Sequence, residues 1–372
     1  MKYTKPLVLT KNSYKVLPCL IIPFSCLIVF HFNLCYYAIT LSLPLLPHLL
    51  MARLAIFTSE EQKLFSSPPV FNSVERKRYF IFPTGILEIA KKLDKSHNRI
   101  YFLLVYGYFK ATNRFYQGKF HQKDIDFVAT RLGIVVQGSK VDYKRRTYRN
   151  HRETILAYTG CKKFEATAEQ LLATQLTPMV RSHVRPKLML QQACDILIKN
   201  KIEIPSYYTL YTIISREMKQ HQEALNQTIK QSLTKECKAL LDALLYKENG
   251  SRYRLTLLKR FSHSTKPAKI KSNIADLILL QGLFQTIEPV IKSLQLTNEG
   301  MKYYAYAAIK FKIFQILERA DTERYLYLLA FIANQYYTLQ DLLIDVFIQS
   351  VAGAERNDSA YKKVINCYLA AY

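Results

Sequence analysis

The fold class of this 372-residue chain follows from the stretch Ile100-Tyr-Phe-Leu-Leu-Val-Tyr-Gly-Tyr-Phe109, which is apolar on almost every side. Such a run predicts a central helix that is buried all round. Segments on either side of it, such as 84–93 and 124–132, carry apolar residues at helical spacing on one face only. No segment combines sustained alternation of apolar and polar residues with hairpin dipeptides. The sequence therefore predicts a mainly α-helical fold.

The composition points to a polyanionic partner. Lys and Arg number 53 against 28 Asp and Glu, which gives a net charge of +25. Most of this excess must lie on solvated surface, where its commonest partner is a polyanion. A hydrophobic content of 49% excludes wholesale disorder, and only 10 glycines argue against folds rich in glycine turns or nucleotide loops. The seven cysteines form no Cys-x-x-Cys pair, so we expect reduced thiols and no zinc site.

The first fifty residues differ from the rest, because no charged residue occurs between Lys15 and Arg53. The apolar part, 17–50, is long enough to cross a bilayer. Four prolines interrupt it, and an ordinary start, Met51-Ala52-Arg53, follows. We interpret 1–50 as an upstream extension, with a transmembrane segment or a buried apolar arm as alternatives. We expect a cytoplasmic bacterial protein, at a membrane only if 17–50 is real and inserted.

The sequence contains no convincing active site. The segment 133–140 has the glycine spacing of a phosphate-binding loop, but its serine and lysine are exchanged. Asp341 and Asp345 share a helix face, an arrangement that usually solvates a helix surface rather than holding catalytic metals. Whether the protein is an enzyme is left open at this point.

A basic tract interleaved with aromatic residues extends from Lys140 to Arg152, and six of its thirteen residues are Lys or Arg. Helical spacing places Arg145, Arg149 and Arg152 on one face. Arginine pairs bidentately with phosphate oxygens or with the guanine edge, so we expect DNA contacts here. The alternative is a solvated helix that only aids solubility. The DNA-contact candidates in this region are Arg99, Lys144, Arg145, Arg146, Tyr148, Arg149, His151 and Arg152.

A second basic tract lies between Glu248 and Asp276, where no acid occurs. It is either a second clamp on DNA or a plain linker between domains. Two stretches also have the spacing of helix-turn-helix units, Asp124 to Gly133 and Ala193 to Glu217. The candidate contacts of the second tract are Arg252, Arg254, Lys259 and Arg260.

Several runs, taken in order, resemble a known family. They are Asn98-Arg-Ile100, Phe127-Val-Ala-Thr-Arg-Leu-Gly-Ile134, Arg146-Thr-Tyr-Arg-Asn-His-Arg-Glu153, Tyr158-Thr-Gly160, Ile202-Glu-Ile-Pro-Ser206 and Arg324-Tyr-Leu-Tyr-Leu-Leu-Ala-Phe331. Together they resemble the N-terminal region of the large replicative transposases of the Tn-three family.

The resemblance implies tandem helical DNA-binding domains that recognise the terminal inverted repeats of a transposon. It also implies that the acidic, magnesium-dependent catalytic domain lies beyond this chain, which is expected to be a truncated fragment without a cofactor of its own. The expected partner is double-stranded DNA, with possible self-association and no membrane. The expected organisation is a leader at 1–50, a first DNA-binding domain at 51–165, a second at 166–250, a basic linker at 251–272, a helical bundle region at 273–357 and an aberrant tail at 358–372.

Two other hypotheses stay open. The chain is alternatively a membrane-anchored basic protein, held by 17–50, that binds nucleic acid or anionic lipid. It is alternatively an intact catalytic transposase, which would require metal-dependent cleavage that depends on Asp341 or Asp345.

Overall fold

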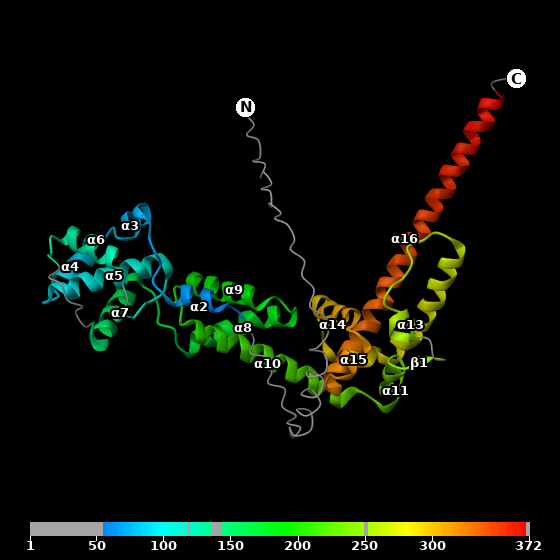
Figure 1. Cartoon of the computed structure of the whole chain (residues 1–372), viewed down its shortest axis with the longest axis horizontal. Helices are drawn as coiled ribbons and strands as arrows, with labels where there is room; N and C mark the ends of the chain where they lie inside the picture. Colours follow the sequence, from blue (N-terminus) through cyan, green and yellow to red (C-terminus); the bar gives the residue numbers. More distant parts are fainter. Residues whose placement is uncertain (1–54, 118–119, 136–142, 249–251, 370–372) are drawn as a thin grey trace, which may run out of the picture. The chain divides into compact units, whose positions relative to one another are not determined.

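The computed structural model describes residues 55–117, 120–135, 143–248 and 252–369, all within the compact unit Leu54–Tyr372. These residues form fifteen helices and one two-stranded antiparallel ribbon, so the predicted mainly α-helical fold is confirmed (Figure 1). The ribbon consists of β1 (Lys247–Glu248) and β2 (Arg252–Tyr253). Three hydrophobic cores organise the helices.

The first core surrounds α5 (Ser96–Thr112), the helix predicted from the apolar stretch. Nine consecutive or near-consecutive residues of α5 are buried, from Ile100 to Phe109. Gly107 allows the closest approach, because a Cβ atom there would lie 2.3 Å from the ring of the fully buried Phe80. Four helices pack around α5: α3 (Ser73–Tyr79), α4 (Thr84–Lys91), α6 (Gln122–Leu132) and α7 (Arg145–Thr159).

One buried carboxylate fastens this core. Asp124 is fully buried at the start of α6, where its Oδ1 accepts from Arg76 Nε at 2.6 Å. Its Oδ2 accepts from the Tyr108 hydroxyl at 2.5 Å. Burial and the hydrogen bond to Asp124 raise the pKa of Tyr108 far above its ordinary value. Both oxygens of the carboxylate are therefore satisfied, as a buried charge requires.

The second core contains α2 (Ser59–Ser66), α8 (Ala166–Arg181), α9 (Pro186–Lys199) and the N-terminal half of α10 (Tyr207–Ser232). The sequence grouped residues 51–165 as one domain, whereas the structure packs α2 in this second core. The aromatic residues around α2 explain this packing, because the Phe57 ring just before the helix stacks on the Tyr207 ring with centroids 5.3 Å apart. Ile56 is buried in the same core.

Two helix starts in these cores are fixed by local side-chain caps. Thr58 caps α2 by accepting from the Glu61 N–H, and the Glu61 carboxylate accepts from the Thr58 N–H in return. The start of α3 is capped by Asn72, whose side-chain oxygen accepts from the N–H groups of Val74 and Glu75. Asn72 therefore satisfies two of the N–H groups that a helix start leaves without a partner.

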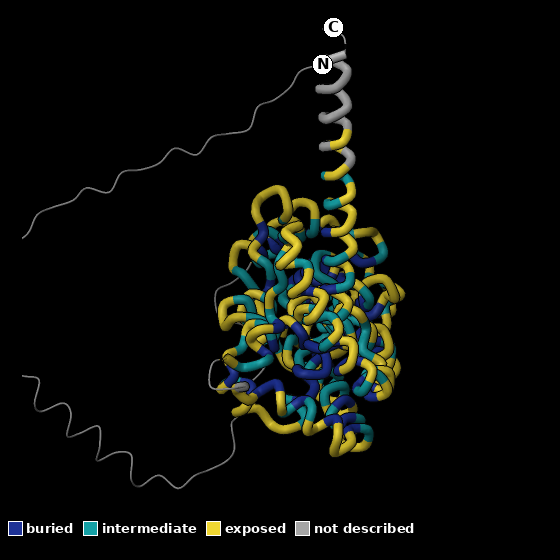
Figure 2. Tube along the Cα trace, turned by 90° about the vertical axis from the view of Figure 1, so that its right-hand side faces the viewer, coloured by how far each residue is buried: buried dark blue, intermediate teal, exposed yellow. Residues whose placement is uncertain are grey.

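The third core begins with the C-terminal half of α10, which contributes Leu225 and Ile229. The long helices α13 (Pro267–Leu294) and α16 (Asp321–Leu369) pack against each other in it. Beyond Val346, the described residues of α16 are exposed or half-buried (Figure 2). The remaining helices of the core are α11 (Lys235–Ala243), α12 (Arg254–Leu257), α13 (Pro267–Leu294), α14 (Asn298–Lys310), α15 (Ile313–Leu317) and α16 (Asp321–Leu369).

The segment 251–272 and helix α13 both contribute side chains to the third core. Within 251–272, where the sequence suggested a linker, Leu255 is fully buried and Leu258 is 1% exposed. The basic residues around these two leucines led to the linker prediction, because their charges dominate the composition of the segment. Among the described residues, α13 alone has the length and apolar composition to span a bilayer, and it also supplies buried residues such as Leu280 and Ile287 to the third core.

Candidate nucleic-acid interface

The N-terminus of α7 carries charges of the wrong sign for a helix start. Lys144 occupies the N-cap position and provides no side-chain cap, and the first turn contains Arg145 and Arg146 but no acid. The helix dipole places partial positive charge at this end, so each cation costs roughly 0.3–1 kcal/mol there. The arrangement lowers the stability of α7, and within the described part of the chain no side-chain cap covers its first N–H groups, which are therefore open to an anion.

Four cations of this helix end face solvent. The side chains of Lys144, Arg145, Arg146 and Arg149 are exposed, and none forms an ion pair with a residue that the structure describes. We call these four residues the α7 cationic face. Arg145 and Arg149 lie one turn apart, so both point the same way from the helix. Four uncompensated cations around open N–H groups form a surface suited to phosphate oxygens.

His151 and Tyr148, also predicted to contact DNA, have other roles in the structure. His151 is 4% exposed, and its Nδ1 lies 2.6 Å from the Tyr143 hydroxyl. Burial lowers the pKa of His151 to about 4, so the ring is neutral at physiological pH. Tyr148 is half-buried, and burial raises its pKa to about 12. His151 therefore belongs to the first core rather than to the surface, whereas Tyr148 packs against the edge of that core.

Arg152 forms an ion pair with Glu203. Its Nε donates to Glu203 Oε2 at 2.8 Å, and its Nη2 donates to Glu203 Oε1. Glu203 is 2% exposed, and its Oε1 also accepts from the Phe164 N–H at 2.9 Å. The carboxylate therefore uses Arg152 as its counter-ion. Arg152, predicted to contact DNA, is thus paired in the structure with a buried carboxylate 51 positions away in sequence, while its own side chain stays partly exposed.

The remaining candidates are scattered. Arg99 is half-buried and its Nε donates to the Leu93 carbonyl at 2.7 Å. Lys259 donates to the Phe311 carbonyl at 2.7 Å, and burial lowers its pKa. Arg254 is half-buried at the start of α12, whereas Arg252 and Arg260 are exposed. The second tract therefore keeps two exposed arginines, whereas Lys259 is held by the Phe311 backbone at the edge of the third core.

The two helix-turn-helix patterns also fold differently from each other. Gly133 ends α6 in the left-handed conformation, with φ of 64°, as the first pattern predicts. The second pattern joins α9 to α10 through residues 200–206, longer than the three or four residues of such a turn. A bridge between Lys162 and Ile202 occupies this connection. The structure thus uses the second pattern as a junction between the first two cores.

That junction is held by backbone and amide hydrogen bonds. Asn113 ends α5 with φ of 54°, and its side chain donates to the Ile202 carbonyl at 2.7 Å. The Asn113 carbonyl accepts from the Ile204 N–H at 2.9 Å. The Lys162 N–H donates to the Lys201 carbonyl at 2.7 Å. Three chain segments, 113–116, 161–164 and 201–206, therefore meet at fixed positions.

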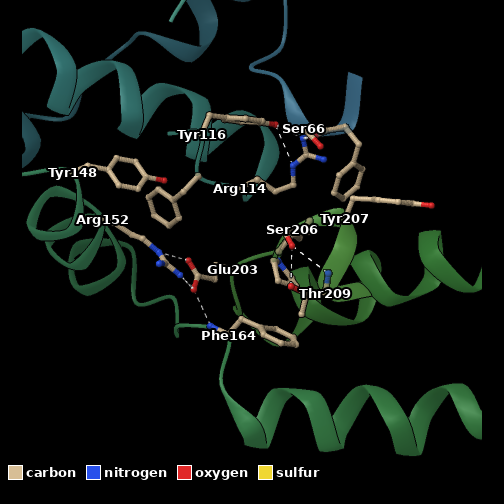
Figure 3. Close-up of a pocket in the computed structure, with 14 residues that line it drawn as sticks. Ser66, Arg114, Tyr116, Tyr148, Arg152, Phe164, Glu203, Ser206, Tyr207 and Thr209 are labelled. Atoms are coloured by element: carbon tan, nitrogen blue, oxygen red, sulfur yellow. Dashed lines mark hydrogen bonds and ion pairs between the residues drawn. The ribbon is translucent and has the colours of Figure 1, made fainter. Parts of the chain in front are cut away.

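A hollow of about 390 Å³ lies at this junction (Figure 3). Its walls come from the end of α2, the segment after α5, one side of α7 and the N-terminus of α10. Figure 3 shows Tyr148 of α7 pointing toward it, with Tyr116 of the segment after α5 and Tyr207 of α10 at its border. We call it the junction pocket; its aromatic members are Phe65, Phe115, Tyr116, Tyr148, Phe164 and Tyr207, its charged members are Arg114, Arg152 and Glu203, and its remaining members are Ser66, Ile204, Pro205, Ser206 and Thr209.

Arg114 is a pocket residue that the sequence did not single out. Its guanidinium carbon lies 3.8 Å from the centroid of the Phe65 ring and 5.0 Å from that of Tyr116. It donates to the Tyr116 hydroxyl and to the Phe65 carbonyl. Glu203 was missed in the same way, although an acid between Ile202 and Ile204 is a signal for a paired, buried carboxylate. With two arginines and one acid, the pocket is cationic.

Comparison with known proteins concerns this same part of the chain. Residues 56–216 match the model of a family described as Domain of unknown function (DUF4158), a domain found typically in transposase-like proteins. The buried residues of the first and second cores, from Ile56 to Ile214, all fall within the matched range. The α7 cationic face and the junction pocket also lie within it. No curated protein matches the chain.

Proposed function

We propose that this protein binds double-stranded DNA through the α7 cationic face, at the terminal inverted repeats of a transposon, as the N-terminal region of a Tn-three-family transposase does. One observation carries the proposal: four exposed cations surround the uncapped N-terminus of α7 and have no carboxylate partner among the described residues. A duplex offers regularly spaced phosphates that neutralise such a surface and accept from its open N–H groups.

The unfavourable placement of the charges supports binding over mere solubility. Cations added for solubility cost little on a helix flank, whereas here they stand at the end where the dipole repels them. A bound phosphate removes that repulsion and gains charge-assisted hydrogen bonds. The match to a domain typical of transposase-like proteins supports the choice of transposon DNA among possible duplexes.

The test compares two triple variants of equal charge by fluorescence anisotropy on a duplex that carries the element's terminal repeat. Arg145→Gln, Arg146→Gln and Arg149→Gln remove three cations of the α7 cationic face while keeping good helix formers. Lys230→Gln, Lys235→Gln and Lys238→Gln remove three exposed cations elsewhere. We expect the first variant to weaken binding at least tenfold and the second to change it little.

A scrambled duplex tests the sequence-specific part at roughly 150–200 mM salt, where phosphate-only binding fades. Weaker binding to the scrambled duplex is expected. Equal affinity for both duplexes would remove the terminal repeat from the proposal, and equal losses in the two triple variants would remove the α7 cationic face. Vesicles of anionic lipid serve as a further ligand, and preferential binding to them would favour the lipid hypothesis instead.

A further inference from the structure

From the composition of the junction pocket, we infer that it takes the base of an unpaired nucleotide next to the DNA that the α7 cationic face holds. This inference rests on the proposed function, because the duplex is what brings the nucleotide to the pocket. It adds a second kind of contact, stacking on a base, to the phosphate contacts already argued.

The pocket has the right chemistry for a flat, aromatic and anionic ligand. Six aromatic rings line it, and every base offers a π-face on which such rings stack. Its volume of about 390 Å³ lies within the ~300–1,000 Å³ typical of small-ligand sites. The lone carboxylate, Glu203, has both oxygens occupied by Arg152 and the Phe164 N–H, so it does not oppose an approaching phosphate.

The walls are held before any ligand arrives. Arg114 is fixed between Phe65 and Tyr116 by ring contacts and by its bonds to the Tyr116 hydroxyl. Tyr207 is held by its stack on Phe57. At the start of α10, Ser206 Oγ accepts from the Thr209 N–H at 3.2 Å. A pocket held in this way loses little conformational entropy on binding a base.

The pocket and the α7 cationic face lie close together along α7. Tyr148 lines the pocket, and it lies on α7 between Arg145, three residues before it, and Arg149, the next residue. At 1.5 Å of rise per residue, Tyr148 is only about 4.5 Å along the helix axis from Arg145. A strand whose phosphates contact these arginines therefore passes beside the pocket. An unpaired nucleotide in that strand is the ligand that the site fits, whereas bases within an intact duplex stay stacked on each other.

The experiment uses the full chain and two duplexes that differ only in one overhang. Both carry a short single-stranded overhang of the same length and charge, but in one duplex the overhang nucleotides lack bases. Fluorescence anisotropy gives the ratio of the affinities for the base-bearing and the base-free overhang. The measurement is made with the overhang at the 3′ end and again at the 5′ end. We expect the base-bearing overhang to bind about fivefold tighter or more. A factor of about five is the lower end of the range measured for one base stacked on an aromatic ring. Equal affinities for all pairs would overturn the pocket assignment.

Variants then locate the preference. Tyr148→Leu removes a pocket ring, and the ratio is expected to fall toward one. Tyr208→Leu is the matched control, because Tyr208 is 73% exposed and does not line the pocket; the ratio should persist. An unchanged ratio in Tyr148→Leu, or an equal fall in both variants, would contradict the assignment.

Photo-crosslinking of the unaltered protein covers the case in which Tyr148→Leu fails to fold. A 5-iodouracil base in the overhang couples on irradiation to an aromatic ring stacked on it, and peptide mapping identifies the ring. Adducts at Phe115, Tyr148 or Tyr207 support the pocket, and adducts found only outside it overturn it. Duplex binding that depends on the α7 cationic face but ignores the bases refutes the pocket alone. Absence of any duplex binding refutes the proposed function and the pocket together.

Discussion

Arg152 of α7 and Glu203, four residues before α10, form a bidentate ion pair that joins the first and second cores. The guanidinium stays partly accessible, with 30% of its side chain exposed, whereas the carboxylate side chain is 3% exposed. The pair forms one wall of the junction pocket. Arg152 differs in this from Arg145, Arg146 and Arg149, which form no ion pair with a described residue.

Glu203→Gln is expected to destabilise the protein by roughly 1–3 kcal/mol, below the ~3–5 kcal/mol of a fully buried pair because Arg152 retains solvent contact. Urea unfolding measures the change. The matched control is Glu165→Gln, whose exposed pair with Lys163 at 3.5 Å should contribute less than about 0.5 kcal/mol. Similar losses in both variants would show that Glu203 has no special role in the junction.

Gly107→Ala is expected to destabilise the first core by about 1–3 kcal/mol or more, since the added methyl group meets the buried Phe80 ring at 2.3 Å. Gly282→Ala provides the contrast, because nothing lies within 4 Å of its added Cβ on α13. There the smaller entropy of the unfolded chain should stabilise by roughly 0.5–1 kcal/mol. Chemical unfolding of both variants tests the pair, and a tolerated Gly107→Ala would contradict the close packing.

The pH dependence of stability should carry a contribution from His151. Its folded pKa of about 4 lies below the unfolded value of 6.5, so between these values the unfolded chain binds a proton that the folded chain does not. Stability is therefore constant from this source above about pH 6.5 and falls as pH drops toward 4, by at most ~1.4 kcal/mol per pH unit.

His151→Gln should flatten that fall, although it also lowers stability near neutral pH by disturbing the contact with Tyr143. Urea midpoints measured across the acidic range provide the comparison. His183 and His221 contribute in the same direction, because burial lowers the pKa of each, so some slope should survive. His263→Gln, at an exposed position, controls for the loss of a histidine. A slope identical to that of the original protein would refute the role assigned to His151.

The salt dependence of DNA binding should count the phosphates that the α7 cationic face neutralises. Each neutralised phosphate adds about −0.9 to the slope of log affinity against log salt. Removing Arg145, Arg146 and Arg149 together should therefore make the slope shallower by roughly 2.7. Titrations at several salt concentrations measure it. A reduced affinity with an unchanged slope would mean that these arginines act through folding rather than through phosphates.

Local sequence features predicted much of the helical architecture. The apolar run that forms α5 is unambiguous, because a helix apolar on all sides is stable only when buried. The Thr58–Glu61 capping box at the start of α2 is equally local, since both partners lie within one turn. The basic tract of α7 was also visible, and four of its cations are exposed as a nucleic-acid surface requires.

Where helices form and where positive charge accumulates thus follow from the amino-acid order alone, because both depend on residues within a few positions of each other. Which cations of α7 stay without a described partner depends instead on how distant segments pack together. Arg152 is neutralised by a carboxylate 51 positions away, and His151 is turned into an apolar core. The junction pocket likewise exists only after the segments around Arg114, Phe164 and Glu203 meet. Burial and ion pairing between distant segments depend on packing, which no local spacing encodes.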